Sequence, residues 1–538
     1  VSEGNPMFVV EALRLADEPS VAGSSPKVRG VIAARLAQLS PAAAELAGVA
    51  ATIGREFTAD VLADASGAED AALVNGLDEL WRRGLVRAHG PDAYDFSHGK
   101  IREAAYRALS PAQARNHHLH VARALERGRA AADAVSAQIA AHYEMAGASA
   151  EAVAWHRRAA GAAQRLHANA DAADSLERAL ALLDRLPSGR SRAELELELL
   201  TALPAALVPI GGFLSARMAA VHERALALAA RLDVEPEPPL VRAIALAHLS
   251  RGDFDIAQQV GERLRARAER DGDDVLWVES AYVLGVAAFW RGRLEDARAQ
   301  LAAAVDRHRP ERGGTHLERY GQDPQIFCLM RLAHALWLLG RDDEAGHALE
   351  VAATVSQRSP HAHSRVHTLV WSALLALDRH DEQELRRHTQ ALALHRAAGW
   401  QVAFAVELFG GYLEVGDGRV ERGMARVRRV VGHMRDVPAA PGGLGISTRV
   451  LVQACAAAAD AQAGLAAAGE ALDAGGGSAV WEAEIRRLRA SFLAALGSTP
   501  VAVEAELTRA LETARRQGAR PFEARVRADL ERLHARAL

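Results

Sequence analysis

A short pattern that recurs along the second half of the chain limits its fold more than any other feature. Each copy is a glycine followed five residues later by an alanine, at the start of a helical segment. The clearest copies are Gly252–Ala257, Gly292–Ala297 and Gly340–Ala345, and weaker copies place the position equivalent to this alanine at Glu384, Gly423, Gly464 and Ala505. Successive positions differ by 40, 48, 39, 39, 41 and 41 residues. A nearly constant step of about 40 residues predicts a solenoid in which each helix pair covers the hydrophobic flank of its neighbour.

A small residue at the turn allows two antiparallel helices to cross closely, as in the tetratricopeptide repeat (TPR). Leu284 and Gly285 before one turn, with Ala297 and Leu301 after it, follow that pattern. The period of an ordinary TPR is shorter than the step seen here, so the helices or connections of this chain are longer. The one long interval contains Asp306–Gln322, rich in Pro, Gly, Arg and His, which we expect to be a loop and a candidate contact site.

The composition supports a mostly α-helical protein. Alanine, leucine and arginine dominate, and aromatic residues make up 5% of the chain. The 64 basic and 68 acidic residues give a net charge of −4, which provides no general attraction to nucleic acid or to membranes. Cys328 and Cys455 lie far apart in helical stretches, so we expect buried thiols in a reducing compartment. We see no signal peptide and no apolar run long enough to span a bilayer, and expect a cytoplasmic protein.

The N-terminal part of the chain, up to position 128, has a different organisation. Helical patterns follow one another up to Asp70–Arg83, and two short extended segments then flank the turn His89–Asp92. Helices followed by a strand, a turn and a strand are typical of a winged helix. A helix that reads DNA should be basic, whereas Asp70–Arg83 carries Asp70, Asp78 and Glu79 against two arginines, so we do not expect this module to bind DNA.

Several segments resemble the bacterial signal-transduction ATPases of the STAND class. The segment Gly4-Asn5-Pro6-Met7-Phe8 resembles the end of their ATPase region, and Ile53-Gly54-Arg55-Glu56-Phe57 and Phe96-Ser97-His98 resemble their winged helix. The block Arg319–Pro324 and the tail Glu484–Ala519 resemble their C-terminal repeats. The resemblance implies an ATPase-lid remnant at 1–26, a winged-helix domain at 27–128 and TPR-like repeats at 129–538.

The resemblance also implies roles for two residues. Pro6 would contact the adenine and His98 would face the nucleotide, with ATP or ADP and Mg²⁺ bound by an ATPase domain that precedes this chain. The alternatives from the residues themselves are a helix-starting proline and a histidine with a local hydrogen bond at a helix N-terminus. Implied partners are that ATPase domain, an inducer or protein on the repeats, DNA through a separate effector domain, and other copies in a nucleotide-dependent oligomer.

The chain itself lacks recognisable catalytic chemistry. A phosphate-binding loop needs Gly-x-x-x-x-Gly-Lys-Ser/Thr, and the one Gly-Lys pair, Gly99-Lys100, has neither the upstream glycine nor the following hydroxyl. We therefore expect no hydrolysis and no cofactor in this chain. Two histidine groups, His117/His118/His120 with His142 and His361/His363/His367, lack the further ligands of a metal site, so we expect no metal.

The tryptophans Trp277, Trp290, Trp337, Trp371, Trp400 and Trp481 fit helix-packing positions, although some of them could line a ligand groove. Gly475-Gly476-Gly477 fits a linker between repeats, because no strand precedes it.

Three functions are compatible with these features. The first is the regulatory part of an ATP-dependent transcriptional regulator that carries a SARP-type activation domain. The second is the control arm of an ATPase linked to a class III nucleotide cyclase. The third is a free-standing TPR scaffold that binds a protein. The repeats do not distinguish the first two, and Val1 can be either a natural start or a cut.

Overall fold

A computed structural model describes residues 26–90, 92–128, 133–211, 215–359, 361–395, 400–436, 443–473 and 479–537. These residues form 27 α-helices, three short strands and three short 3₁₀ helices, so the mostly α-helical fold is confirmed. They divide into two compact units. Unit 1 contains the described residues up to 162 together with 174–192, and unit 2 contains 163–173 together with those from 193 onward. Pro6 and the expected lid remnant, apart from Pro26, lie outside the described residues.

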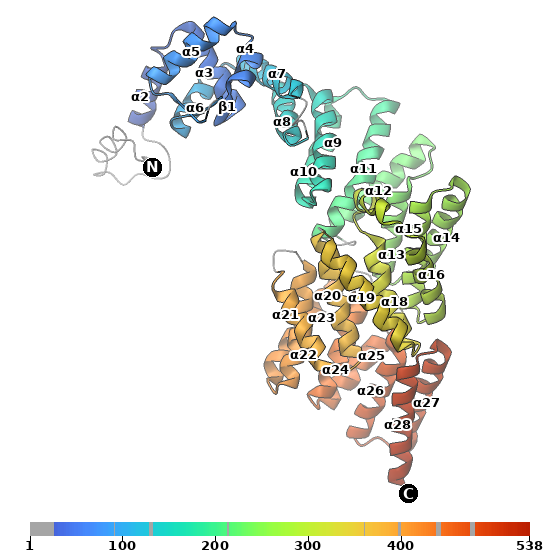
Figure 1. The fold of residues 1–538 in the computed structure, drawn as a ribbon. Helices are drawn as coiled ribbons and strands as arrows, with labels where there is room; N and C mark the ends of the chain where they lie inside the picture. Colours follow the sequence, from blue (N-terminus) through green and yellow to red (C-terminus); the bar gives the residue numbers. More distant parts are fainter. Residues whose placement is uncertain are drawn as a thin grey trace, which may run out of the picture. The chain divides into compact units, whose positions relative to one another are not determined.

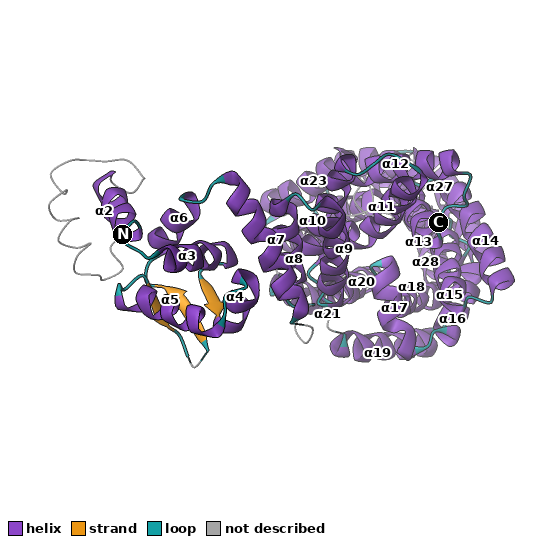
Figure 2. Ribbon diagram, turned by 90° about the horizontal axis from the view of Figure 1, so that it is seen from above, coloured by secondary structure: helices purple, strands orange, loops and turns teal. Residues whose placement is uncertain are grey.

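Unit 1 combines helices with a small sheet (Figures 1 and 2). Its elements are α2 (Pro26–Leu36), α3 (Pro41–Ile53), β1 (Glu56–Thr58), α4 (Ala59–Ser66), α5 (Asp70–Arg82), β2 (Val86–Ala88), β3 (Ala93–Phe96), α6 (Gly99–Arg107), α7 (Pro111–Arg127), α8 (Ser136–Ala146), α9 (Ser149–Arg165), α10 (Asn169–Leu182) and η2 (Leu183–Arg185). The sheet order is β1-β3-β2 and both pairings are antiparallel. The predicted strand–turn–strand is present as β2 and β3.

Local sequence explains where these helices begin. The Ser40 hydroxyl accepts from the backbone N–H of Ala43 at 3.2 Å, and Pro41 follows in the first turn of α3. Helix α5 buries Leu73, Leu77 and Leu80 in the core of unit 1. The spacing of Leu73, Leu77, Leu80 and Trp81 in the sequence predicts that all four share one face of this helix. For Trp81 this is wrong: Trp81 is 54% exposed, because it is one residue, or about 100°, beyond Leu80 around the helix.

Unit 2 is a TPR-like solenoid of consecutive helix pairs (Figure 1). The helices are α11 (Arg190–Gly211), α12 (Ala216–Leu232), α13 (Pro238–Arg251), α14 (Phe254–Asp271), α15 (Asp274–Trp290), α16 (Leu294–Arg307), η3 (Pro310–Arg312), α17 (Gly313–Tyr320), α18 (Pro324–Leu338), α19 (Asp342–Arg358), α20 (Ala362–Asp378), α21 (Glu382–Ala393), α22 (Trp400–Gly416), α23 (Val420–Asp436), α24 (Gly443–Ala457), α25 (Ala461–Asp473), η5 (Ala479–Trp481), α26 (Glu482–Ala495), α27 (Pro500–Gln517) and α28 (Arg520–Ala537). From α13 on, each helix packs on its predecessor in the array, and α17 is an additional helix that packs on α13. The first helices of successive pairs, α13, α15, α18, α20, α22, α24, α26 and α28, also pack on one another.

The buried residue at each turn is the fourth of the second helix of a pair. It is Ala257 in α14, Ala297 in α16, Ala345 in α19, Leu385 in α21, Gly423 in α23, Gly464 in α25 and Val503 in α27. The sequence placed two of these positions at Glu384 and Ala505, and the structure corrects them. Glu384 is half-buried and Ala505 is exposed. The buried position lies at a fixed distance from the first residue of each helix, whereas the spacing between repeats varies.

Small residues let these pairs approach closely, as the sequence suggested. Helices α22 and α23 cross at Gly411 and Gly423. A Cβ on Gly423 would lie 2.5 Å from the backbone oxygen of Gly411 and 2.8 Å from the nitrogen of Val415. The backbones therefore touch at this crossing, and no side chain fits between them.

The segment Asp306–Gln322 is not the predicted exposed loop. It contains η3 and α17, and His316, Tyr320 and Gln322 in it are buried. Gly321 has a φ of 71°, and a Cβ on it would lie 2.4 Å from the backbone oxygen of Ala205 in α11. The insertion is packed into unit 2, because it supplies polar partners for buried charges described below.

The interior of unit 2 also connects repeats that are distant in sequence. Helix α28 packs on α18, and η5 packs on α15. The ring of Phe522 in α28 meets that of Trp337 in α18, with centroids 5.9 Å apart. The described helices include none that is long and apolar enough to cross a membrane.

Candidate functional site

His98 caps the N-terminus of α6. Its Nδ1 accepts a hydrogen bond from the backbone N–H of Lys100 at 3.4 Å, and its side chain is buried. This is the local hydrogen bond that the sequence offered as the alternative to nucleotide contact. Since Pro6 lies outside the described residues, the nucleotide-facing role of both residues stays a prediction.

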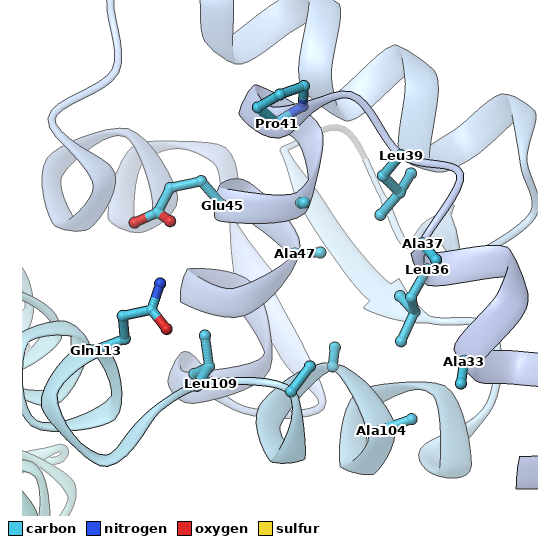
Figure 3. Close-up of a pocket in the computed structure, with 13 residues that line it drawn as sticks. Ala33, Leu36, Ala37, Leu39, Pro41, Glu45, Ala47, Ala104, Leu109 and Gln113 are labelled. Atoms are coloured by element: carbon cyan, nitrogen blue, oxygen red, sulfur yellow. The ribbon is translucent and has the colours of Figure 1, made fainter.

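An apolar groove lies on unit 1 between α2, α3, α6 and the start of α7 (Figure 3). Its volume is about 480 Å³. Figure 3 shows Glu45 and Gln113 on one side, and Leu36 and Leu39 on the other. The remaining lining residues are apolar, namely Ala33, Ala37, Pro41, Ala44, Ala47, Ala104, Ala105, Ala108 and Leu109. No local pattern in the sequence predicts this groove, because its walls come from separate helices of unit 1.

The first histidine group of the sequence divides in the structure. His118 and His142 face each other with their Nδ1 atoms 2.8 Å apart, and His118 Nε2 is 2.8 Å from the hydroxyl of Tyr106. His117 instead bonds Glu45 at 2.9 Å. Burial lowers the pKa of both His118 and His142 to about 4, so both rings are neutral at pH 7. No group of three possible metal ligands exists among the described residues.

In unit 2 a chain of buried charges begins at Glu279 of α15. One carboxylate oxygen accepts from Arg242 Nε at 2.9 Å, and the other is 2.7 Å from His316 Nδ1. Arg242 also donates to Gln322 at 2.9 Å and to the backbone oxygen of Tyr320 at 3.3 Å. His316, Tyr320 and Gln322 belong to the insertion, so this network holds the insertion against α13 and α15.

A second buried network centres on Asp378 at the end of α20. Its carboxylate pairs with Arg449 of α24 and accepts from Trp481 Nε1 at 2.8 Å; it also bonds His334 Nε2 at 2.7 Å. The backbone oxygen of Asp378 accepts from Arg525 of α28 at 2.6 Å. Burial alone would raise the pKa of Asp378, but Arg449 and these hydrogen bonds outweigh it and lower that pKa. One carboxylate thus joins α18, α20, α24 and η5.

Between these two networks lies Arg331 of α18, which is 3% exposed. Its Nη1 donates to the backbone oxygen of Phe327 at 3.3 Å and lies 3.1 Å from His367 Nε2. The guanidinium lies over the ring of Trp371, 4.4 Å from its centroid. The second histidine group is therefore part of the packing: His367 contacts Arg331, and its ring stacks on Phe327 with centroids 3.9 Å apart.

Tryptophans fill much of the remaining interior. Trp290 lies with its ring centroid 5.9 Å from that of Trp371 and 5.6 Å from that of Trp481, and Trp337 is also buried. Their predicted packing role is confirmed. Trp277 is half-buried between two arginines, and the Trp400 side chain lies outside the described residues.

Both cysteines are buried, as expected. Burial raises the pKa of Cys455 to about 11 and also raises that of Cys328, so both thiols stay protonated at neutral pH.

None of these buried charges was predicted from the sequence, since charged residues are normally exposed. A usable signal existed in the first helices of the pairs. Helix α18 has a single arginine among its residues, and α24 likewise contains Arg449 as its only charged residue. A helix that is apolar all around is a buried helix, so a lone charge within it must be buried and needs a partner.

Comparison with known proteins places the chain only broadly. No family model matches it. An uncharacterised protein of Rhizobium meliloti is 26% identical over 562 aligned residues, which cover 99% of this chain and 54% of that protein. The chain thus spans about half the length of the curated relative it matches.

Among solved structures, a STAND protein with a tetratricopeptide repeat sensor from Pyrococcus horikoshii has 11% identity and a TM-score of 0.46, with 88% of this chain and 68% of that chain covered. A Rap protein in complex with competence and sporulation factor has 12% identity and a TM-score of 0.39, with 72% and 99% covered. Yeast Tom70 has 10% identity and a TM-score of 0.32, with 80% and 94% covered. All three scores are too low to establish a shared fold.

Proposed function

We propose that this chain is the sensor and relay part of an ATP-dependent bacterial transcriptional regulator of the STAND class. Unit 2 is a TPR-like repeat scaffold; in this proposal it binds an inducer or a protein partner. Unit 1 would act as a winged-helix module that passes the bound state to an ATPase domain earlier in the same protein. DNA would be contacted only by a separate effector domain.

The observation that carries the proposal is the order of elements within one chain. Unit 1 has helices, a strand, two further helices and a two-stranded hairpin, in the order expected of a winged helix, and a repeat solenoid follows it. The Rhizobium meliloti relative aligns with almost the whole chain and is about twice as long. That length leaves room in such a protein for ATPase and effector domains.

The surface of α5 favours contact with protein over contact with DNA. Arg82 pairs with Asp78, and Arg83 pairs with Glu79 at 3.1 Å, so neither arginine is free of a carboxylate. Trp81 and Val74, two helical turns apart on the same face of α5, are 54% and 63% exposed. An exposed aromatic beside neutralised arginines fits a protein neighbour better than a phosphate backbone.

In this proposal the state of the sensor reaches the nucleotide through unit 1. His98 would hold the nucleotide of a resting, closed form, with Pro6 beside the adenine. Ligand binding to unit 2 would favour an open form that assembles into oligomers, as a shift between two populations.

The test uses the natural full-length protein. The coding sequence upstream should contain Gly-x-x-x-x-Gly-Lys-Ser/Thr in the same reading frame. Purified protein should retain ADP, and His98→Ala should release it. His89→Ala is the matched control, because His89 is exposed in the turn between β2 and β3.

The outcomes separate the alternatives. A cyclase domain upstream of the phosphate-binding loop would support the control arm of a cyclase-linked ATPase. Absence of any such loop would contradict both ATPase proposals and leave the free-standing TPR scaffold. Equal ADP retention by His98→Ala and the control would refute only the nucleotide-holding role of His98 and would leave the rest of the proposal standing.

A further inference from the structure

Among the described residues of unit 2, three arginines are almost completely buried, and one of them lacks a counter-charge there. Arg242 pairs with Glu279 at 2.9 Å and Arg449 pairs with Asp378. Arg331 has no carboxylate within 4.0 Å among the described residues. The internal segments of unit 2 outside the described residues, namely 212–214, 360, 396–399, 437–442 and 474–478, contain no Asp or Glu. The chain therefore offers this guanidinium no carboxylate from those segments either.

An uncompensated buried guanidinium is costly. Removing an isolated charge from water costs several kcal/mol even after relaxation, and arginine cannot escape by losing its proton because its pKa is too high. The observed partners are all neutral: a backbone oxygen, an imidazole nitrogen and the face of Trp371. Arg331 Nε has no hydrogen-bond partner among the described residues.

The neighbouring helix α20 carries a second buried polar group without a partner within the described residues. His363, one helical turn before His367 on α20, stacks on Phe327 with ring centroids 5.6 Å apart. Its Nε2 is buried and has no hydrogen-bond partner within the described ranges. In the tautomer that carries its proton on Nε2, His363 can donate to an anion. His367 cannot act likewise, because its Nε2 faces the N–H of Arg331 as an acceptor.

We propose that Arg331 is the anchor of a binding site for a small oxyanion, a carboxylate or phosphate group, in the interior of unit 2. The planar guanidinium can present parallel N–H groups to two oxygens, which suits these anions. Tyr282, Trp371 and Phe327 bound the site with aromatic surface and exclude water. Since Arg331 is enclosed, the anion enters by local separation of α18 and α20, so binding is slower than in an open groove.

This inference deepens the proposed sensor role by naming a ligand class for unit 2. The existence of the site does not depend on that role, but its purpose in signalling does. The site belongs to this chain alone, so it can be tested without an ATPase domain. A failure here would leave the relay proposal intact, and a missing ATPase domain would leave the site intact.

The experiment is equilibrium dialysis of the full chain against inorganic phosphate, and separately against acetate, at constant ionic strength in chloride. We expect saturable binding of one anion per chain by at least one of the two. Arg331→Met should lose this site, with affinity at least tenfold lower. Arg387→Met should bind as the unaltered chain does, because Arg387 is exposed and pairs with Glu384 on the surface of α21. Equal binding by Arg331→Met, or no saturable site for either anion, would overturn the proposal.

A second readout separates ligand binding from a structural role. Without added oxyanion, Arg331→Met should unfold at a urea midpoint equal to or higher than that of the unaltered chain, because an unpaired charge is removed. A clearly lower midpoint would show that Arg331 holds the fold and would overturn the proposal. If Arg331→Met does not fold, Arg331→Lys serves instead, because lysine keeps the positive charge but lacks the parallel N–H donors of the guanidinium. This variant should bind at least tenfold more weakly, and unchanged affinity would count against the site.

Discussion

Asp378 connects several helices in the interior of unit 2. Its carboxylate meets Arg449, His334 and Trp481, and its backbone oxygen meets Arg525. A buried ion pair adds little net stability over apolar packing, but the loss of one partner leaves the other charge stranded. Removing Asp378 should therefore lower the stability by far more than the intact network adds to it.

We predict that Asp378→Asn lowers the free energy of unfolding by about 3–5 kcal/mol, since Arg449 then stays buried without a counter-charge. Urea unfolding followed by tryptophan fluorescence measures this, because Trp481 lies in the same network. Asp343→Asn in the exposed first turn of α19 is the control and should cost below about 1 kcal/mol. A loss as small as that of the control would contradict the network.

The histidine pair of unit 1 predicts a pH dependence. Burial lowers the pKa of His118 and His142 to about 4, below the ordinary value of 6.5. Between these values the unfolded chain binds protons that the folded chain does not, so stability falls as the pH drops from 6.5 to 4. The slope contributed is at most about 1.4 kcal/mol per pH unit for each histidine.

The measurement is the urea midpoint across this pH range for the natural chain and for His142→Gln, which keeps a hydrogen-bonding side chain but does not titrate. The variant should show a shallower decline towards pH 4. An identical decline in both proteins would mean that the pair is not held neutral by the fold.

At the scale of elements, close helix crossings make a sharp prediction within α23. Gly423→Ala should lower the free energy of unfolding by about 1–3 kcal/mol, because the added Cβ meets the backbone of α22 and neither backbone can yield easily. Gly432→Ala in the same helix has nothing within 4 Å and should raise stability by about 0.5–1 kcal/mol. Urea midpoints of the two variants should move in opposite directions; a shift in the same direction would contradict the crossing.

In the repeats, the helix pairs could be predicted from the sequence, but the burial of single residues and of the insertion could not. Helix pairs and their regular step followed from glycine and alanine spacing, because the crossing geometry demands small residues. The prediction for Trp81 failed because a shift of one residue turns a side chain by about 100° around the helix, from the buried face to the exposed one. The prediction for Asp306–Gln322 failed because its polar composition suggested a loop. The fold of that segment depends on Arg242 and Glu279, which belong to α13 and α15, and no local pattern reports such partners.

The candidate sites were less predictable than the fold. The local bond of His98 at a helix N-terminus was one of the two alternatives that the sequence offered, and its nucleotide-facing role stays a prediction. The groove beside α3 and the interior charges depend on tertiary contacts. Arg331 lies in a helix whose apolar composition already marked it as buried. That Arg331 has no carboxylate partner among the described residues can be known only once the neighbouring helices are placed.

At the scale of the whole of unit 2, the repeats do not behave as an open array. In a simple solenoid each repeat contacts only its neighbours. Here α28 packs on α18, and Arg525 of α28 bonds the end of α20, 147 residues away in sequence. The interior is filled by charges and tryptophans, so the last repeat supports the middle ones. Such a closed interior gives a ligand a way to affect several repeats at once.

Amide hydrogen exchange tests this closure most directly. The double variant Phe522→Ala/Arg525→Ala removes the two side chains by which α28 contacts Trp337 and Asp378. Arg532→Ala is the control, since Arg532 in the same helix is exposed and pairs with its neighbour Asp529. We expect the double variant to speed exchange in α18 and α20 as well as in α26–α28, and the control to change neither. Faster exchange confined to α26–α28 would contradict the closed interior.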